Sequence, residues 1–231
     1  MNAAPRYAIY WTPPPAHPLW RAGCEWLGRD AADGSQHATP RAATATPRRY
    51  GFHATLKPPL RLRSGQAPDA LLDAAHRLAR ETPAFAMPPL SVQTLADFVA
   101  LRPAVPLDAD HPLRRLADAC VRALDPWRAP PAGDELLRRD AQRGLSPGQG
   151  ELLQRWGYPH VFEHWRFHMT LSDSLPSDAP DDALRQQLLV EATRFFAAAL
   201  ELPLTCDALC VFVEATAGAP FMLAHRFMLE G

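Results

Sequence analysis

Lysine is almost absent from this sequence of 231 residues, in which Lys57 is the only one among 24 basic side chains. The 25 acidic residues nearly balance these bases, so the formal net charge is -1. A chain with this balance has no broad electrostatic attraction to long nucleic acids. A phosphate compound should therefore be held by a local site and not by an extended basic face.

The sequence also lacks regular cysteine pairs and long hydrophobic runs. Its four cysteines form no CxxC pair, and a chain of this length can bury a core without disulfides, so we expect reduced, buried thiols. No apolar run approaches the roughly 20 residues that span a bilayer. The first residues show no charged segment followed by an apolar one. We therefore expect a cytoplasmic protein with no membrane partner.

Alternating strand and helix patterns predict an α+β architecture. Strands are expected near residues 6–11, 50–56, 89–95, 97–102, 165–171, 204–213 and 220–229, and helices near 19–28, 69–80, 111–124 and 181–200. Residues 29–47 are polar and rich in Gly, Ser, Thr and Pro, which predicts an exposed loop. Prolines break the pattern over 125–162, which we interpret as an inserted cap.

The predicted elements repeat. A strand carrying His-x-Thr-Leu is followed by a helix and two strands in both 48–103 and 163–231, approximately, and the two histidines are 115 positions apart (168 minus 53). We therefore expect residues 1–231 to form a single bilobal domain. It should contain two pseudo-symmetric, mostly antiparallel sheets with outer helices around a central cleft.

The repeated motif carries the candidate catalytic residues. Side chains alternate between the two faces of a strand, so His53 and Thr55 should share one face, and His168 and Thr170 should share the corresponding face of the other strand. Their neighbours along both strands are apolar and should face a core. Two such polar faces would line one cleft with two imidazoles and two hydroxyls.

This set of side chains suits attack on a phosphodiester. One histidine can accept a proton from water while the other gives a proton to the leaving oxygen, because imidazole titrates near neutral pH. The threonine hydroxyls can donate to the non-bridging oxygens. A lone strand histidine is usually structural. Two copies at matching places of a duplicated unit favour the catalytic interpretation, although the sequence does not say which ring is the base.

The segments GFHATL (51–56) and FHMTL (167–171) resemble the two signature motifs of the two-histidine phosphoesterase superfamily. The segments RYAIYWTP (6–13), RYGFHATLKPP (49–59) and FVALRP (98–103) look more narrowly like the branch associated with bacterial phosphonate metabolism (DUF1045-like).

The resemblance implies a bilobal fold with a pseudo-two-fold axis, hydrolase chemistry without a metal or other cofactor, and a small cyclic phosphate as substrate. A ribose cyclic phosphate of phosphonate breakdown is the natural candidate. The 125–162 insert departs from the plain superfamily pattern, so nucleic-acid substrates of distant members are not carried over.

Four further residues are candidates for substrate binding. Lys57 keeps the strand parity of Thr55 if the strand continues to Pro58. Arg102 ends a strand expected beside the motif strand, where a guanidinium could hold a second phosphate. Tyr7 lies on the first strand, and Arg166 has the parity of His168. For each of them a structural role is the alternative, namely a surface charge, a rim ion pair or core packing.

Two other functions remain open from the sequence. His160, His164 and His168 recur every four residues, and on one helix face they could bind zinc in a metal-dependent hydrolase. Pro159 and the strand-like alternation around His168 speak against that helix. The cleft could also bind a nucleotide or an RNA end without turnover. The oligomeric state is undetermined, with a monomer as the simplest expectation.

Overall fold

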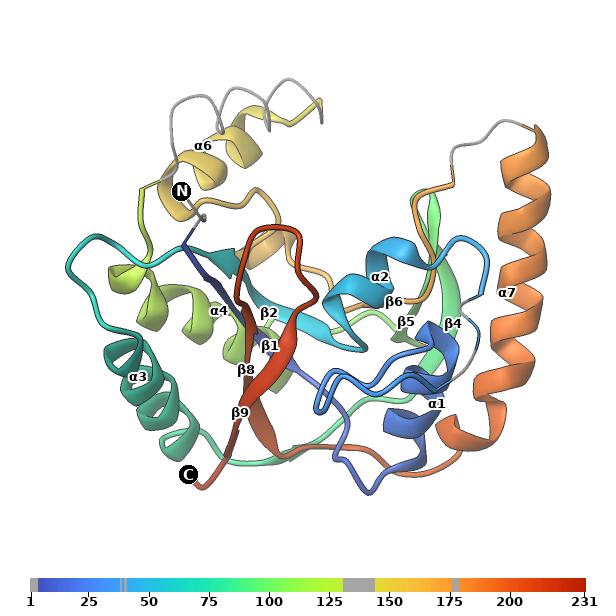
Figure 1. The fold of residues 1–231 in the computed structure, drawn as a ribbon, viewed down its shortest axis with the longest axis horizontal. Helices are drawn as coiled ribbons and strands as arrows, with labels where there is room; N and C mark the ends of the chain where they lie inside the picture. Colours follow the sequence, from blue (N-terminus) through green and yellow to red (C-terminus); the bar gives the residue numbers. More distant parts are fainter. Residues whose placement is uncertain (1–3, 38, 40, 131–143, 176–178) are drawn as a thin grey trace.

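The computed structural model describes residues 4–37, 39, 41–130, 144–175 and 179–231. Figure 1 shows helices α3 and α4 on one side of the molecule and α1 and α7 on the other, with the strands running between these two groups. Among the helices of these ranges, none combines the length and the apolar composition needed to cross a bilayer. The fold is α+β, and its strands pair in antiparallel fashion.

The strands are β1 (Arg6–Trp11), β2 (Ala54–Leu60), β3 (Phe85–Ala86), β4 (Leu90–Leu95), β5 (Phe98–Pro103), β6 (Met169–Thr170), β7 (Thr205–Cys206), β8 (Ala208–Glu214) and β9 (Met222–Met228). The α-helices are α1 (Pro18–Leu27), α2 (Ala45–Tyr50), α3 (Pro68–Arg80), α4 (Pro112–Leu124), α6 (Pro147–Trp156) and α7 (Ala179–Leu200). Two short 3-10 turns, η1 (Asp125–Trp127) and η2 (Phe162–His164), lie at the two ends of the predicted insert.

The main sheet has seven strands in the order β4-β5-β6-β2-β1-β8-β9. The expectation of two separate sheets is therefore corrected, because the two halves join where Ala54 of β2 pairs with Met169 of β6. These are the middle residues of the two His-x-Thr motifs. The motif strands thus lie side by side at the centre of one continuous sheet, and β3 pairs with β7 in a separate two-stranded sheet.

The repeated halves of the chain exchange their hairpins. Strand β6, from the second repeat, pairs with β5 of the first, whereas β2, from the first repeat, lies on the side of β8 and β9 of the second. The helices follow the same exchange, because α3 packs on β8 and β9 while α7 packs on β4 and β5. Each half of the sheet is therefore built from both halves of the sequence.

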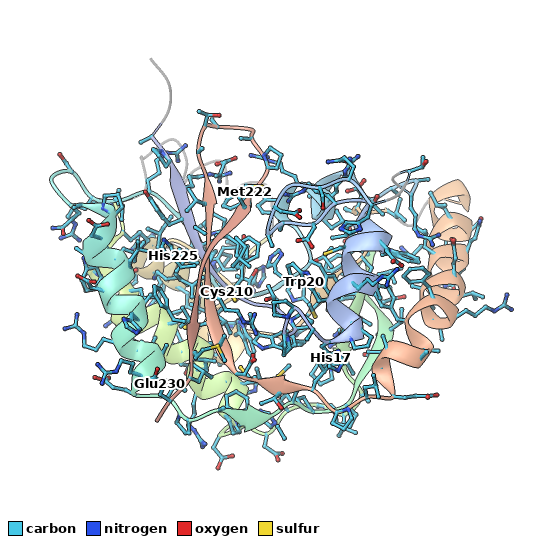
Figure 2. All side chains as sticks on the ribbon, turned by 60° about the horizontal axis from the view of Figure 1, so that its bottom comes forward. His17, Trp20, Cys210, Met222, His225 and Glu230 are labelled. Carbon is cyan, nitrogen blue, oxygen red and sulfur yellow. The ribbon has the colours of Figure 1, made fainter. Side chains whose placement is uncertain are left out.

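Two hydrophobic clusters lie on opposite faces of the sheet. The larger joins Tyr7, Ile9 and Trp11 of β1 to apolar residues of α1, α3, α4 and α7. The smaller contains the alternate β1 residues Ala8 and Tyr10, with partners from α1, β8 and the segment before β9. In Figure 2, Trp20 and Cys210 of the smaller cluster lie near the middle of the molecule, whereas Glu230 lies at its edge beside α3. The four cysteines are buried and free, as expected.

Two local predictions need correction. Residues 45–50, predicted partly as loop and partly as strand, form the short helix α2. Strand β2 begins at Ala54 and continues through Pro58 and Pro59 to Leu60, beyond the predicted end at residue 56. Proline is tolerated where a strand has no partner on one side, and β6 pairs with β2 only at Ala54. Pro58 and Pro59 therefore lie where β2 is not paired with β6.

Candidate functional site

The four motif side chains meet across the β2–β6 junction. The pairing of Ala54 with Met169, continued by one residue each way, places His53 opposite Thr170 and Thr55 opposite His168. His53 and His168 are thus diagonal neighbours across the two strands. In an antiparallel pair, diagonal neighbours are about 7–8 Å apart.

The alternation predicted for the motif strands is present on both of them. The apolar neighbours are buried, namely Phe52, Ala54, Leu56, Phe167, Met169 and Leu171. The histidines and threonines between them are only half-buried. Because the apolar side chains fix each strand against the core, the polar ones are presented together on the opposite face.

The two imidazoles are oriented by the same kind of hydrogen bond. Nδ1 of His53 lies 2.8 Å from the carbonyl oxygen of Gly51, and Nδ1 of His168 lies 2.8 Å from that of Arg166. A carbonyl can only accept, so each Nδ1 carries the proton and each neutral ring leaves Nε2 as the acceptor. The hydroxyl of Thr55 lies 3.2 Å from Nε2 of His53 and can donate to it.

Gly51 has a backbone conformation that few other residues could adopt. Its φ is +80° and ψ is 174°, and it caps the end of α2. A Cβ built there would lie 2.7 Å from the Cβ of Ala31. The glycine therefore allows the chain to turn sharply from α2 into β2 and to aim its carbonyl at His53.

Burial favours the neutral form of both rings. It is the main cause that lowers the pKa of His53, to about 4, and the nearby His168 lowers it further, while the bond to Gly51 opposes the shift. The pKa of His168 is also lowered, by burial first and then by the charge of Arg102, against the effect of the Arg166 carbonyl. A bound anion would favour the charged imidazolium and raise both values.

The ring of Tyr10, in β1, packs against the imidazole of His53. The two rings are stacked, with centroids 3.7 Å apart and planes inclined by 22°. Tyr10 is buried, and burial raises the pKa of its hydroxyl well above the usual range. The stack fixes the imidazole from the side, while Gly51 fixes it through Nδ1.

A cavity of about 300 Å³ opens beside these residues. It is lined by Arg6, Tyr10, Thr46, Pro47, Tyr50, His53, Thr55, Pro58, Pro59, Tyr158, Pro159 and Thr170. Three of the four motif side chains are part of this lining, and His168 stands beside it, opposite Thr55 on the neighbouring strand. The predicted insert contributes Tyr158 and Pro159, so it forms part of the wall.

Helix α2 is held at both ends. The carboxylate of Asp173, five residues after His168, accepts hydrogen bonds from the backbone amides of Ala45 and Thr46 at 3.1 and 2.6 Å. At the other end, the buried Arg29 donates to the carbonyls of Arg48 and Arg49. These contacts fix the helix that brings Thr46, Pro47 and Tyr50 to the cavity.

Arg6 reaches the cavity from the start of β1. Its Nε donates to the buried carboxylate of Glu214, which also accepts from Arg49. Burial alone would raise the pKa of Glu214, but the hydrogen bonds from the two arginines outweigh it and lower that pKa to about 2. Glu214 is therefore ionised, and it holds both guanidinium groups near the cavity wall.

Lys57 does not line the cavity, which corrects the sequence prediction. Its side chain is 1% exposed, and its Nζ donates to Asp125 and to the carbonyl of Val121, both at 3.1 Å. The physical reason is a β-bulge. Ile9 of β1 pairs with Lys57 but the next residue, Tyr10, pairs with Thr55, so one extra residue of β2 shifts the alternation. Lys57 therefore faces α4 and not the histidines.

The other three predicted binding residues have different locations. Tyr7 lies on the opposite face of β1 from Tyr10, in the larger hydrophobic cluster, so its placement as a cavity residue is corrected. The Arg166 side chain is exposed and is not part of the lining. Its backbone carbonyl accepts the hydrogen bond from His168. Arg102 lies near enough to His168 for its charge to lower the pKa of that ring. Its Nη1 donates to the side-chain oxygen of Gln93 at 3.1 Å.

The three histidines of the zinc alternative do not share a helix. His160 precedes η2, His164 ends that 3-10 turn, and His168 directly precedes β6. Within the described ranges, no three His, Cys, Asp or Glu side chains converge in a way that could hold a metal ion. The helical geometry on which that alternative depended is therefore wrong.

Several cavity residues were missed by the sequence analysis. Arg6, Tyr10 and Tyr50 were given no role, although they lie in the segments RYAIYWTP (6–13) and RYGFHATLKPP (49–59), and Arg6 and Tyr10 share one parity of the first strand. A charged residue on an otherwise apolar strand was the available signal, because that side of a strand must find water or a partner.

A comparison with protein families gives one match that covers most of the chain. The model of the family described as "Protein of unknown function (DUF1045)" matches residues 55–222. This range contains His168 and both motif threonines and begins two residues after His53.

Two curated relatives carry the name "Ribose 1,5-bisphosphate phosphokinase PhnN". The protein of Janthinobacterium sp. (strain Marseille) is 39% identical over 236 residues, covering 98% of this chain and 51% of its own length. The protein of Laribacter hongkongensis (strain HLHK9) is 37% identical over 233 residues, covering 97% and 52%. The chain thus spans about half the length of the curated relatives it matches.

The solved structures that the chain matches are more distant in sequence. LigT of E. coli complexed with NADP+ has a TM-score of 0.44 and 15% identity, covering 99% of this chain and 100% of its own. Usb1 of Kluyveromyces marxianus has a TM-score of 0.37 and 9% identity, covering 96% and 99%.

Proposed function

Since the chain belongs to the DUF1045 family, we propose that it is a metal-independent phosphodiesterase that opens a small cyclic phosphate by two-histidine acid-base catalysis. The observation that carries this proposal is the matched pair His53 and His168. Both rings have Nδ1 bound to the carbonyl two residues earlier, which leaves both Nε2 atoms as acceptors, that of His53 lying 3.2 Å from the Thr55 hydroxyl. A threonine hydroxyl stands opposite each ring across the strand junction.

The proposed reaction needs one proton transfer at each ring. The neutral imidazole takes a proton from water, whose oxygen attacks phosphorus, and the protonated imidazole gives its proton to the ring oxygen that leaves. One phosphorus–oxygen bond forms and one breaks, and the product is a phosphomonoester with a free hydroxyl. Thr55 and Thr170 donate hydrogen bonds to the non-bridging oxygens, whose charge they stabilise in the transition state.

We further propose that the fold is bilobal with a pseudo-two-fold axis between β2 and β6, and that the whole chain is one such domain. The exchanged hairpins support this view, because the two repeats then occupy equivalent places around the motif strands. The axis would relate His53 to His168 and Thr55 to Thr170. It accounts for the identical carbonyl bonds to the two rings.

The substrate that we propose is a pentose cyclic phosphate, such as a ribose cyclic phosphate of phosphonate breakdown. The cavity of about 300 Å³ is at the small end of ligand sites and suits a sugar phosphate better than a polymer. The curated relatives are named for a ribose bisphosphate, which is a compound of the same chemical class.

Kinase chemistry of the P-loop type does not fit this chain. The phosphate-binding loop of that type requires Gly-Lys followed by Ser or Thr. The only lysine here follows Leu56, precedes Pro58 and is buried against Asp125. A phosphokinase activity of the longer relatives would therefore need residues from the half that this chain does not match.

Ring opening can be followed directly by phosphorus NMR on a panel of pentose and nucleoside cyclic phosphates. We expect conversion to a phosphomonoester that persists with excess EDTA and falls at least 1,000-fold in His53→Gln and in His168→Gln. Circular dichroism should show both variants folded. Binding without conversion by the wild-type protein would instead favour the non-catalytic module, and loss of activity with EDTA would refute metal independence.

A further inference from the structure

Two buried tryptophans donate hydrogen bonds to the backbone of the two motif segments. Nε1 of Trp165 lies 2.9 Å from the carbonyl oxygen of Thr55, and Nε1 of Trp26 lies 2.8 Å from that of Leu171. Trp165 is 5% exposed and Trp26 is fully buried. Each His-x-Thr-Leu segment therefore has an indole bound to its backbone, and the proposed proton transfers use neither ring.

The two bonds lie where the pairing of the motif strands ends. Thr55 follows Ala54, at which β2 pairs with β6, and Leu171 follows the last residue of β6. A buried backbone carbonyl needs a hydrogen-bond donor, which a neighbouring strand supplies only as far as the strands are paired. The indole N–H groups thus supply a donor to each segment just beyond the junction.

The indole of Trp165 is linked to His53 through a single residue. Thr55 carries the carbonyl that Trp165 binds and also the hydroxyl that lies 3.2 Å from Nε2 of His53. The backbone N–H of Trp165 donates to the carbonyl of Phe162 at 2.9 Å, and its ring packs edge-on against that of Phe167, with centroids 6.3 Å apart. Because the indole is fixed in this way, it also fixes the Thr55 hydroxyl relative to His53.

Trp26 is held equally firmly at the second motif. Its ring centroid lies 5.4 Å from that of Phe195 and 5.5 Å from that of Phe196. The carbonyl that it binds belongs to Leu171, the residue after Thr170. The chain that carries Thr170 is therefore tied to helix α1 and, through the ring contacts, to α7.

We propose that Trp165 and Trp26 are positioning residues for the two motif threonines. Each indole fixes the backbone that places a threonine hydroxyl beside the phosphate, and neither ring touches the reacting atoms. The inference rests on the proposed function for the reaction that the threonines assist. The position of Thr55 relative to His53 can be measured without substrate, so the positioning role and the proposed function can fail separately.

Two substitutions of Trp165 separate the hydrogen bond from the packing. Trp165→His keeps a donor, because Nε2 has the same place in the imidazole ring as Nε1 in the five-membered ring of indole. Trp165→Phe has no donor but keeps more of the buried surface. It should lower kcat about 10- to 30-fold with KM within about threefold of the wild type, since Thr55 acts in the transition state. Trp165→His should be less stable in urea and yet keep kcat within about fivefold. A purely structural role would give the opposite order of rates.

Trp20→Phe is the matched control. Trp20 is also 5% exposed, and its Nε1 donates to Asp30 at 3.2 Å, outside both motifs. This variant loses an indole hydrogen bond, so its stability should fall about as much as in Trp165→Phe, while kcat and KM should stay within about twofold of the wild type. Equal losses of kcat in the two variants would point to a general effect of packing and refute the positioning role.

Trp26→Phe tests the other motif independently of Trp165. It removes the donor to Leu171 and should lower kcat by a similar factor, with KM within about threefold of the wild type. A folded Trp26→Phe with the kcat of the wild type would contradict the positioning role at Thr170. This variant also decides the proposal if Trp165→Phe does not fold.

NMR titration of the His53 ring is the measurement that needs no substrate. The Thr55 hydroxyl can donate to Nε2 of the neutral ring, which favours the neutral form. Trp165→Phe should therefore raise the pKa of His53, and Trp20→Phe should leave it as in the wild type. An unchanged pKa in folded Trp165→Phe would overturn the proposal. A wild-type protein that opens no cyclic phosphate would refute the proposed function, and this titration would still decide whether Trp165 positions Thr55.

Discussion

The ring of Tyr10 stacks on the imidazole of His53 with 3.7 Å between centroids. The two residues come from neighbouring strands, since Tyr10 pairs with Thr55 in the β1–β2 register. The stack covers one face of the imidazole and contributes to the burial that lowers the His53 pKa to about 4. In the proposed reaction Tyr10 is therefore a positioning residue, which acts through His53.

Replacing Tyr10 with leucine should lower kcat/KM about 10-fold, because aromatic pairs contribute about 0.5–1.5 kcal/mol beyond burial and the ring would become mobile. Tyr10→Phe keeps the ring and should stay within about threefold of the wild-type rate. NMR titration of the His53 ring provides a second measurement, in which Tyr10→Leu should move its pKa upward toward 6.5. An unchanged pKa together with a lower rate would contradict the positioning role.

The sequence alone was sufficient to predict the motif residues and their shared strand face, because alternation is a local property. It could not predict that β2 and β6 would pair, or that the repeats would exchange hairpins. Strand patterns identify strands, but the choice of partner depends on packing between distant segments. One continuous sheet thus replaced the two expected sheets.

Lys57 shows the limit of the alternation rule most clearly. Lys57 is two residues from Thr55, so strict alternation would place both side chains on one face. The bulge between them turns Lys57 to the other face. A bulge depends on how two strands fit and leaves no reliable mark in a single sequence. Arg6 and Tyr10 were missed for a related reason, because the parity of a strand does not say which of its faces will border a cavity.

The dependence of kcat/KM on pH should be bell-shaped with its maximum between about pH 4 and 6.5. The pKa of His53 is lowered to about 4 and that of His168 also lies below its usual 6.5. Below both values neither ring can accept a proton, and above both neither can donate one. Rates from pH 3.5 to 8 on a cyclic phosphate would check this, and activity that keeps rising above pH 7 would argue against the assigned groups.

Folding stability should fall as the pH decreases from 6.5 to 4. His53 binds a proton in the unfolded chain near pH 6.5 but in the folded chain only near pH 4, so acid favours unfolding within this window. The lowered pKa corresponds to a loss of about 3 kcal/mol in the free energy of unfolding, once the pH is below the pKa of His53 in both the unfolded and the folded chain. In urea titrations His53→Gln should lose less stability than the wild type over that range. Parallel curves for the two proteins would contradict the pKa assignment.

Gly51→Ala should lower both stability and activity. The new Cβ would meet Ala31 at 2.7 Å, so the backbone must shift and withdraw the carbonyl that orients His53. We expect a loss of about 2–4 kcal/mol and at least a 10-fold lower kcat. Gly65→Ala is the matched control, because its φ is also +80° but no atom lies within 4 Å of the added Cβ. That variant should lose about 1–2 kcal/mol from strain and keep its kcat.

The ion pair of buried Lys57 with half-buried Asp125 should affect stability and leave catalysis unchanged. Asp125→Ala leaves the Lys57 ammonium, 1% exposed, with only the Val121 carbonyl as a hydrogen-bond acceptor among the described contacts. Leaving a buried charge unpaired costs about 3–5 kcal/mol. Lys57→Met should cost less than about 1.5 kcal/mol, because Asp125 keeps its ion pair with Arg128 at 2.7 Å.

The double variant Lys57→Met with Asp125→Ala should be more stable than Asp125→Ala alone, since it removes the unpaired charge. Urea unfolding of the wild type and the three variants gives the coupling, and the rate with a cyclic phosphate gives the second measurement. Folded Lys57→Met should turn over substrate at the wild-type rate because its side chain faces α4 and not the histidines. A 100-fold loss of kcat in that folded variant would mean that Lys57 does reach the phosphate.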